Sequence, residues 1–405
     1  MQAPVVNLEG RLFSPAMRAV LTAQFLSALA DNALLFAAIA LLKSMPGYQD
    51  WYSPMLQEFF VVAFIVFAPF VGSFADALPK GRVMMIGNGL KFIGALLMLG
   101  GFNPWLAYGL VGLGAATYSP AKYGILSQLV SEENLIKANS LMEGSTIVAI
   151  LTGALLGGWA ADTSVMGTLT GVAACYVLAA LVNAFIPRLP VEHVLGSVGL
   201  GKLVRNFFAA LKTLYIDRDA RFSLIGNSLF WGSGSTLRFL LVAWVPVALL
   251  ITDNKTPANL SGAVAIGIAA GAALAARFVT LSTVNRVLPA GVILGALVMG
   301  MSQLTNLYAT VAILIAIGAC GGMFVVPLNA LLQERGHASV GAGHAIAVQN
   351  FSENIAMLLL VGVYMLILYL GVPAIHSALA FGTLIFISMS GLAWMRMRKN
   401  VMQKA

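Results

Sequence analysis

Charged residues are scarce in this chain of 405 residues. Asp, Glu, Lys and Arg together make up 9% of the sequence, whereas hydrophobic residues make up 60% and the mean hydropathy is +0.90. Soluble domains typically contain about a quarter charged residues, so this balance excludes a soluble globular protein. The composition therefore predicts a membrane protein that crosses the bilayer many times.

Cysteine is rarer still. Only Cys175 and Cys320 occur, and both fall within apolar stretches, so no disulfide framework is expected. The N-terminal segment lacks a short apolar core followed by a small-residue cleavage site. Residues 1–16 are therefore predicted to be a cytoplasmic lead-in and not a signal peptide.

Signatures of lipid enzymes and of ATP hydrolysis are also missing. None of the four histidines is followed five residues later by the aspartate of glycerolipid acyltransferases, and the Gly232–Ser235 run lacks the spacing of a hydrolase elbow. No P-loop is present, so ATP does not drive this chain directly. We expect no catalytic residue, no cofactor and no metal. The net charge of +8 reflects basic inner loops and not a nucleic-acid partner.

Long apolar runs are what the sequence has in abundance. A bilayer span needs about 20 apolar residues, and such runs recur along the whole length. They predict an all-α membrane protein whose twelve transmembrane helices form two six-helix pseudo-repeats. The predicted spans are 17–43, 54–78, 82–101, 104–121, 138–161, 165–187, 222–250, 258–280, 289–303, 306–332, 344–371 and 373–395.

The predicted domains follow from the gap between the sixth and seventh spans. Residues 1–187 and 222–405 are expected to form the two bundles. The connecting segment, 188–221, is basic with apolar residues at helical spacing, which is typical of an amphipathic helix on the inner leaflet. Among the predicted loops, only Lys43 and Lys255 lie on the outer side, and the other basic loop residues lie inside. The positive-inside rule therefore places both termini in the cytoplasm.

Ionisable residues interrupt two of the spans. Asp31, followed by Asn32, lies in the middle of the first span, and Arg238 lies in the middle of the seventh. An offset of 207 residues aligns Asp31 with Arg238 and Pro120 with Pro327. A charge at mid-bilayer costs roughly 2.5–3.5 kcal/mol on insertion scales, so such residues face the bundle interior. Two alternatives remain: an ion pair between the first and seventh helices, or a divided site in which Arg238 holds a phosphate and Asp31 an ammonium.

Further polar residues are candidates for binding. Lys122 lies at the predicted inner end of the fourth helix, where it either contributes to a site or extends to the interface. Glu353 and Asn350 share one polar face of the eleventh helix, which suits a cavity wall or interhelical bonding. Lys91 is expected to have a packing or interfacial role.

Small residues predict close helix packing. Gly153 and Gly157 share one face of the fifth helix, and Gly267 and Gly271 share one face of the eighth. Small residues four apart let helices approach closely inside a membrane.

A loop motif provides the first resemblance to a known family. The segment GSFADALPKGRV contains Gly72, Asp76, Gly81 and Arg82. It resembles the inner-loop motif of the major facilitator superfamily, Gly-x-x-x-Asp followed by Gly and basic residues, with two extra residues before Gly81. In that superfamily the aspartate clamps one conformation, so the resemblance implies a conformational gate. A solvated loop is the alternative.

Three longer stretches are similar to the lysophospholipid transporters of this superfamily: AQFLSALADNALLFAAIALL, YSPAKYGILSQLV and KANSLMEGSTIVAILTGALLGG. The similarity covers essentially the whole chain. It implies import of lysophospholipids, chiefly lysophosphatidylethanolamine, from the outer to the inner leaflet of the inner membrane of a Gram-negative cell.

The same resemblance implies a partner. A cytoplasmic acyltransferase/acyl-carrier-protein synthetase is expected to reacylate the imported lipid. Because the chain ends at Ala405, soon after the last predicted span, that enzyme is expected to act in trans. The alternative function is a proton-coupled transporter of small solutes or drugs, in which Asp31 or Glu353 titrates.

Overall fold

The computed structural model describes residues 13–130, 132–187, 189, 199–340 and 342–402. All regular structure within these ranges is helical. The helices are α1 (Pro15–Lys43), α2 (Tyr52–Asp76), α3 (Lys80–Leu99), α4 (Pro104–Leu129), α5 (Glu132–Thr163), α6 (Val165–Ala184), α7 (Leu200–Ile216), α8 (Arg218–Ala248), α9 (Lys255–Phe278), the 3-10 helix η1 (Leu281–Val287), α10 (Leu288–Met301), α11 (Leu307–Ser339), α12 (Ala342–Tyr369) and α13 (Ala374–Met402).

The described helices are those of a membrane protein. Ten spans among them are long and apolar enough to cross a bilayer, in α1, α2, α3, α5, α6, α9, η1 with α10, α11, α12 and α13. The helices at the other two predicted positions, α4 and α8, have 26 and 31 residues and pack among these spans. The predicted all-α membrane fold is confirmed.

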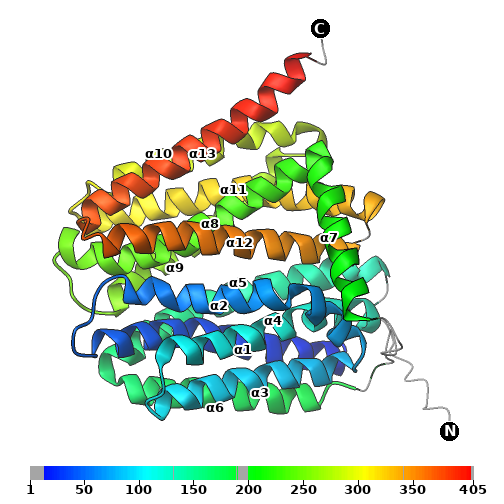
Figure 1. Cartoon of the computed structure of the whole chain (residues 1–405), viewed down its shortest axis with the longest axis horizontal. Helices are drawn as coiled ribbons and strands as arrows, with labels where there is room; N and C mark the ends of the chain where they lie inside the picture. The colour runs from blue at the N-terminus through cyan, green and yellow to red at the C-terminus, as the bar shows by residue number, and fades with distance from the viewer. Residues whose placement is uncertain (1–12, 131, 188, 190–198, 341, 403–405) are drawn as a thin grey trace.

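Two groups of helices make up the molecule (Figure 1). In the first group, α1 packs against α5 and α6, and α4 packs against α2 and α3. The second group repeats this order, because α8 packs against α12 and α13, and α11 packs against α9 and α10. The groups meet where α2 contacts α12 and where α5 contacts α9. Such matched arrangements are typical of parallel six-helix repeats, while the exact bundle and linker boundaries stay a prediction.

Several helices are longer than the apolar runs that predicted them. The helix α4 continues to Leu129 through Pro120, and α11 continues to Ser339 through Pro327. An apolar run measures only the part of a helix that lies in hydrocarbon, whereas the helix ends where its backbone hydrogen bonding ends. Lys122 consequently lies within α4, two turns before its end, and not at the end as predicted.

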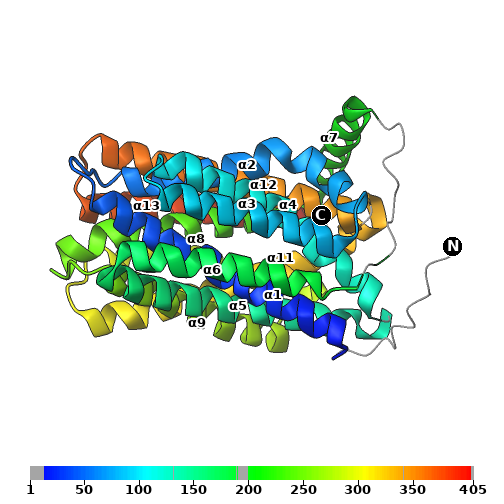
Figure 2. The same cartoon turned by 90° about the horizontal axis from the view of Figure 1, so that it is seen from below.

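The amphipathic helix expected in the linker is α7. Its buried face, with Phe207, Ala210 and Leu214, packs against a cluster from α8, α11 and α12, while Lys202 and Lys212 are exposed. Figure 1 shows α7 crossing the ends of the other helices, and Figure 2 shows it at the edge of the bundle beside α2. The predicted linker residues 190–198 lie outside the described ranges.

The predicted glycine faces are sites of close helix contact. A Cβ atom at Gly153 would collide with the carbonyl oxygen of Leu29, so α5 lies directly against the backbone of α1. A Cβ atom at Gly267 would likewise collide with the carbonyl oxygen of Ile315, so α9 lies against α11. The prediction of close approach is confirmed.

Contacts join the two groups at the end opposite α7. The rings of Trp51 and Tyr369 meet edge to face with their centroids 5.6 Å apart. The carboxylate of Asp162, at the end of α5, accepts hydrogen bonds from the backbone N–H groups of Asn254 at 2.7 Å and Lys255 at 3.0 Å, at the start of α9. Both seams between the groups, α2 with α12 and α5 with α9, are therefore held at this end of the molecule.

Candidate functional site

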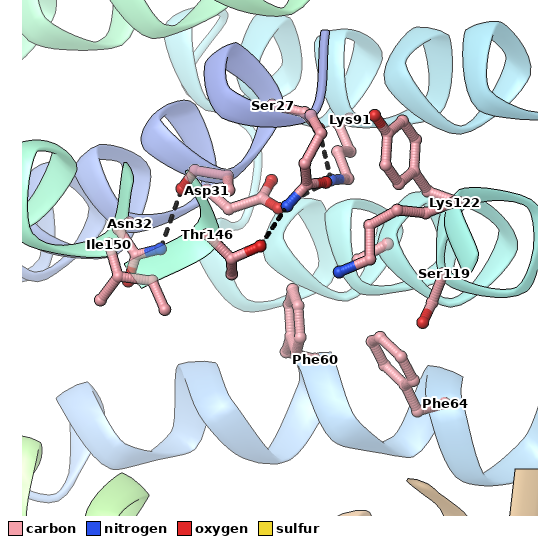
Figure 3. Close-up of a pocket in the computed structure, with 14 residues that line it drawn as sticks. Ser27, Asp31, Asn32, Phe60, Phe64, Lys91, Ser119, Lys122, Thr146 and Ile150 are labelled. Carbon is pink, nitrogen blue, oxygen red and sulfur yellow. Dashed lines mark hydrogen bonds and ion pairs between the residues drawn. The ribbon is translucent and has the colours of Figure 1, made fainter. Parts of the chain in front are cut away.

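A pocket of about 330 Å³ lies inside the first helix group (Figure 3). Residues of α1 through α5 line it. Polar side chains from α1, α3, α4 and α5 form one side, and Phe60 and Phe64 of α2 form the other. The pocket therefore presents charge and aromatic carbon to the same small space.

Two of the residues that line this pocket form an ion pair. The ammonium Nζ of Lys91 on α3 lies 2.7 Å from Oδ2 of Asp31 on α1. The hydroxyl of Tyr176 on α6 donates to Oδ1 of the same carboxylate at 2.8 Å. Lys91 also donates to the hydroxyl of Ser27 at 2.9 Å, which in turn donates to Asn88 at 2.7 Å. Three helices are thus tied together by one hydrogen-bonded network.

The network decides between the alternatives for two residues. Lys91 is packed in the interior and does not reach the interface, because only 1% of it is exposed and its ammonium lies 5.0 Å from the ring centroid of Tyr118. The alternative that Asp31 pairs with Arg238 is wrong for this structure, because Asp31 pairs with Lys91 inside its own helix group. The sequence could not choose between these partners, since pairing depends on which helices become neighbours.

Arg238 lies on α8, in the second helix group. It is half-buried, and among the described residues it forms no ion pair. Arg238 is not among the residues that line the pocket, so the structure places it and Asp31 in opposite helix groups without pairing them.

Two further predicted residues line the pocket. Lys122 on α4 is 9% exposed, and its ammonium lies 4.2 Å from the ring centroid of Tyr123. This burial contradicts the interfacial alternative for Lys122. Asn32 also lines the pocket, and its side-chain amide donates to the carbonyl oxygen of Ala28 at 2.9 Å.

Glu353 and Asn350 belong to a polar cluster of the second helix group. Gln349 donates from Nε2 to Oε1 of Glu353 at 2.7 Å and to Oδ1 of Asn329 at 2.8 Å. Asn227 on α8 donates to the same Asn329 oxygen at 2.7 Å. The carbonyl oxygen of Asn350 accepts from the side chain of Asn354 at 2.7 Å. The sequence identified the polar face of α12 but not its links to α8 and α11.

The predicted gate residues lie where α2 ends and α3 begins. Gly72 and the side chain of Asp76 lie outside the part of the chain whose side chains are described. Gly81 packs against Ile186, the second residue after α6. A Cβ atom added at Gly81 would lie 3.1 Å from the Cβ atom of Ile186. Arg82 is exposed. The gate itself stays a prediction.

This arrangement suits reversible binding of an amphiphile with a charged head. The cations Lys122 and Arg238 offer hydrogen-bond donors to an anion, and Phe60 and Phe64 offer apolar surface to carbon chains. Among the described residues, no group of three His, Cys, Asp or Glu side chains is placed to hold a metal ion.

Comparisons with known proteins agree with this interpretation. Residues 20–361 match the model of the Major Facilitator Superfamily. The chain is 53% identical over 396 residues to the lysophospholipid transporter LplT of Citrobacter koseri, covering 98% of this chain and 99% of the relative. It is 52% identical over 395 residues to the LplT of Escherichia coli strain K12 / DH10B, with the same coverage of both chains.

Solved structures show the same fold at low sequence identity. The nucleoside transporter NupG superposes with a TM-score of 0.74 at 10% identity, over 93% of this chain and 98% of that one. A POT family transporter in complex with 5-aminolevulinic acid gives a TM-score of 0.70 at 11% identity, over 92% and 94% of the two chains.

Proposed function

Because this chain belongs to the major facilitator superfamily and, within it, to the family of the lysophospholipid transporter LplT, we propose that it carries lysophospholipids across a membrane. The observation that carries the proposal is the pocket, which places Lys122 beside Phe60 and Phe64 inside the first helix group. A lysophospholipid has one charged head and one acyl chain, so it needs both kinds of surface. A pocket of about 330 Å³ accommodates a head group, while the chain extends along apolar helix surfaces.

The head-group phosphate is the natural partner of the two cations. Arg238 forms no ion pair among the described residues, and its planar guanidinium can donate two parallel hydrogen bonds to phosphate oxygens. Lys122 belongs to the first helix group and Arg238 to the second, so a phosphate bound by both cations would lie between the groups. Asp31 and Asn32 line the pocket, and we assign Asn350 and Glu353 to the wall of the binding site in the second group.

The direction and location of transport complete the proposal. The substrate is chiefly lysophosphatidylethanolamine, which moves from the outer to the inner leaflet of the bacterial inner membrane. The exposed basic residues of α7, Lys202, Arg205 and Lys212, support a cytoplasmic position for that end of the molecule. Both termini would then be cytoplasmic, and a cytoplasmic acyltransferase/acyl-carrier-protein synthetase would reacylate the lipid.

Alternating access requires a gate at the cytoplasmic end. We assign that role to Gly72, Asp76, Gly81 and Arg82, where α2 turns into α3. Support comes from their resemblance to the superfamily motif and from their position at the end of the molecule that carries α7.

Uptake of labelled lysophosphatidylethanolamine tests the function. Spheroplasts of a strain that lacks its own importer would express the wild type, Arg238→Gln, Lys122→Gln or an empty vector, at matched levels. Lys212→Gln, an exposed lysine on α7, is the control for loss of one positive charge. The wild type and control should import lipid, and each site variant should lose about tenfold, as expected for one charge-assisted hydrogen bond. Wild-type uptake equal to the empty vector would contradict the proposal.

A further inference from the structure

The free glycerol hydroxyl separates a lysophospholipid from an ordinary membrane phospholipid. In the ordinary lipid this oxygen carries a second acyl chain, whereas the phosphate and the rest of the head group are the same in both. Lys122 and Arg238, which bind the phosphate in the proposed function, therefore cannot tell the two lipids apart. A neutral hydrogen-bonding group that binds the hydroxyl would do so.

Thr146 on α5 fixes the orientation of such a group. Its hydroxyl donates to the carbonyl oxygen of Met142, one turn earlier on the helix, at 2.9 Å. A hydroxyl has a single proton, so Thr146 can only accept from its other partner. That partner is Gln24 on α1, whose side-chain Nε2 donates to the Thr146 hydroxyl at 2.8 Å. The amide of Gln24 therefore turns its nitrogen to Thr146 and its oxygen away from it.

The side-chain oxygen of Gln24 is left as an acceptor in the pocket. Gln24 is 3% exposed, and it lines the pocket together with Thr146. Its Oε1 accepts no hydrogen bond from a described residue, and the packing does not seal this oxygen off. Buried acceptors in proteins normally have a donor, so an open acceptor at this place suits a donor from a ligand.

The pocket brings this acceptor to the groups that the rest of the lipid needs. Figure 3 shows Lys122 and Thr146 on the polar side, with Phe60 and Phe64 opposite them. In a lysophospholipid the phosphate ester, the free hydroxyl and the acyl ester lie on neighbouring carbons of one glycerol unit. A pocket of about 330 Å³ encloses a unit of this size, so one molecule can engage Lys122 and Gln24 together.

A lipid with two acyl chains would meet the same acceptor without a donor. Its glycerol oxygen is esterified, so it has no proton to give to Oε1 of Gln24, and two facing oxygens repel each other. Sites that hydrogen-bond a substrate hydroxyl reject analogues without it far more strongly than apolar pockets reject an added or missing methylene. The amide of Gln24 is therefore suited to exclude diacyl lipids.

We propose that Gln24 accepts a hydrogen bond from the free glycerol hydroxyl of the substrate and thereby selects lysophospholipids over diacyl phospholipids. Thr146 is a positioning residue, because its hydroxyl decides which end of the amide faces the pocket. This inference rests on the proposed function, and it adds the group that recognises the missing acyl chain.

The test compares two labelled lipids that differ only in this hydroxyl: lysophosphatidylethanolamine, and its analogue with hydrogen in place of the hydroxyl. Both are supplied below saturation to spheroplasts that express the wild type or a variant. The quantity measured is the ratio of the two uptake rates, which does not depend on the amount of folded protein. Gln24→Met keeps the length of the side chain and removes the acceptor. Gln303→Met makes the same change at an exposed glutamine beyond the end of α10.

The wild type and Gln303→Met should import the lysolipid about fivefold faster than the analogue, as expected for one neutral hydrogen bond. Gln24→Met should bring the ratio close to one while uptake of the analogue persists. An unchanged ratio in Gln24→Met, or a wild-type ratio of one, would overturn the inference alone. Wild-type uptake of neither lipid would instead overturn the proposed function.

Variants of Thr146 provide a second route to the same decision. Thr146→Ser keeps the hydroxyl that accepts from Gln24, so it should keep the wild-type ratio. Thr146→Val removes this hydroxyl and frees the amide to turn, so the ratio should fall about twofold or more. If Gln24→Met does not fold, this pair decides, and equal ratios in the two Thr146 variants would overturn the inference.

Discussion

At the scale of single residues, the least exposed charge in the pocket is Lys91. Its removal would leave Asp31 without a cation while keeping it in place on α1. Breaking a buried ion pair in this way costs about 3–5 kcal/mol, and the 23% exposure of the Asp31 side chain favours the lower end of that range. Lys91→Met should therefore lower the thermal unfolding midpoint of the purified protein.

The exposed Lys212 on α7 provides the control for this prediction. Lys212→Met should unfold at the wild-type temperature, since exposed charges contribute little to stability. The double variant Asp31→Asn with Lys91→Met should recover part of the lost stability, because no unpaired charge remains. A wild-type midpoint in Lys91→Met would show that the pair is not a stabilising contact.

At this scale the sequence singled out the charged residues inside the spans but not their partners. Asp31 and Arg238 stand out because a charge inside an apolar run is expensive, and this cost is independent of the tertiary fold. The partner of Asp31 could not be predicted, because α1 has several neighbours and only packing selects α3. Tyr176 gave no signal in the sequence, since a tyrosine in an apolar span is compatible with any environment.

At the scale of helices, glycine contacts set how closely α9 and α11 pack. Gly267→Val would place two methyl groups against the backbone of α11, which cannot move as a flexible side chain would. Overpacking of this kind costs about 3 kcal/mol at the upper end of its usual range. The yield of monodisperse protein in detergent, measured by size-exclusion chromatography, should fall sharply.

Gly234 is the matched position for that test. It lies on α8, is exposed, and would place a Cβ atom in open space. Gly234→Val carries the same change in helix propensity without a steric clash, so its yield should remain near the wild type. Equal yields for both valine variants would mean that close packing of α9 on α11 is not required for folding.

The amphipathic helix α7 depends on its buried face. Leu214 is fully buried against α8, α11 and α12, whereas Thr213 beside it is exposed. Leu214→Asp would bury an unpaired charge and should release α7 from the bundle. Trypsin should then cleave at Lys202 and Lys212 about tenfold faster, because cleavage follows the population of the open state.

Thr213→Asp tests whether charge alone explains such a result. It adds the same side chain one position away on the exposed face, so its cleavage rate should match the wild type. Equal rates for the two aspartate variants would contradict the packing assigned to α7. The sequence predicted this helix correctly, since its apolar spacing is visible without knowledge of what it packs against.

At the scale of the whole molecule, side-chain contacts join the two helix groups at the end opposite α7. The rings of Trp51 and Tyr369 meet across the seam between α2 and α12, with centroids 5.6 Å apart. Transporters of this architecture work by rocking one half against the other, so this seam must open during the cycle. A chain carrying Trp51→Cys and Tyr369→Cys, with Cys175 and Cys320 replaced by alanine, should lose transport when a short cleavable thiol reagent bridges the seam.

Release of the bridge provides the internal control. Transport should return when a reductant cleaves the reagent, and each single cysteine variant should stay active throughout. Full transport by a completely bridged protein would show that the halves do not part at Trp51 and Tyr369.

The two-group architecture was predictable in outline because apolar runs and loop charges repeat along the chain. The sequence did not show at which end the two helix groups touch. Asp162, for example, binds backbone N–H groups at the start of α9, and every residue except proline has such a group. The pocket was likewise beyond reach, because its lining combines residues from five helices.

The most direct test of the central claim uses purified protein in liposomes, without any other component. Fluorescent lysophosphatidylethanolamine is placed in one leaflet, and its movement to the other is followed by a membrane-impermeant quencher. We predict that the wild type accelerates this movement and that Lys122→Gln and Arg238→Gln, folded and inserted equally well, do so about tenfold less. If folded wild-type protein gives the rate of empty liposomes, lysophospholipid transport by this chain is contradicted.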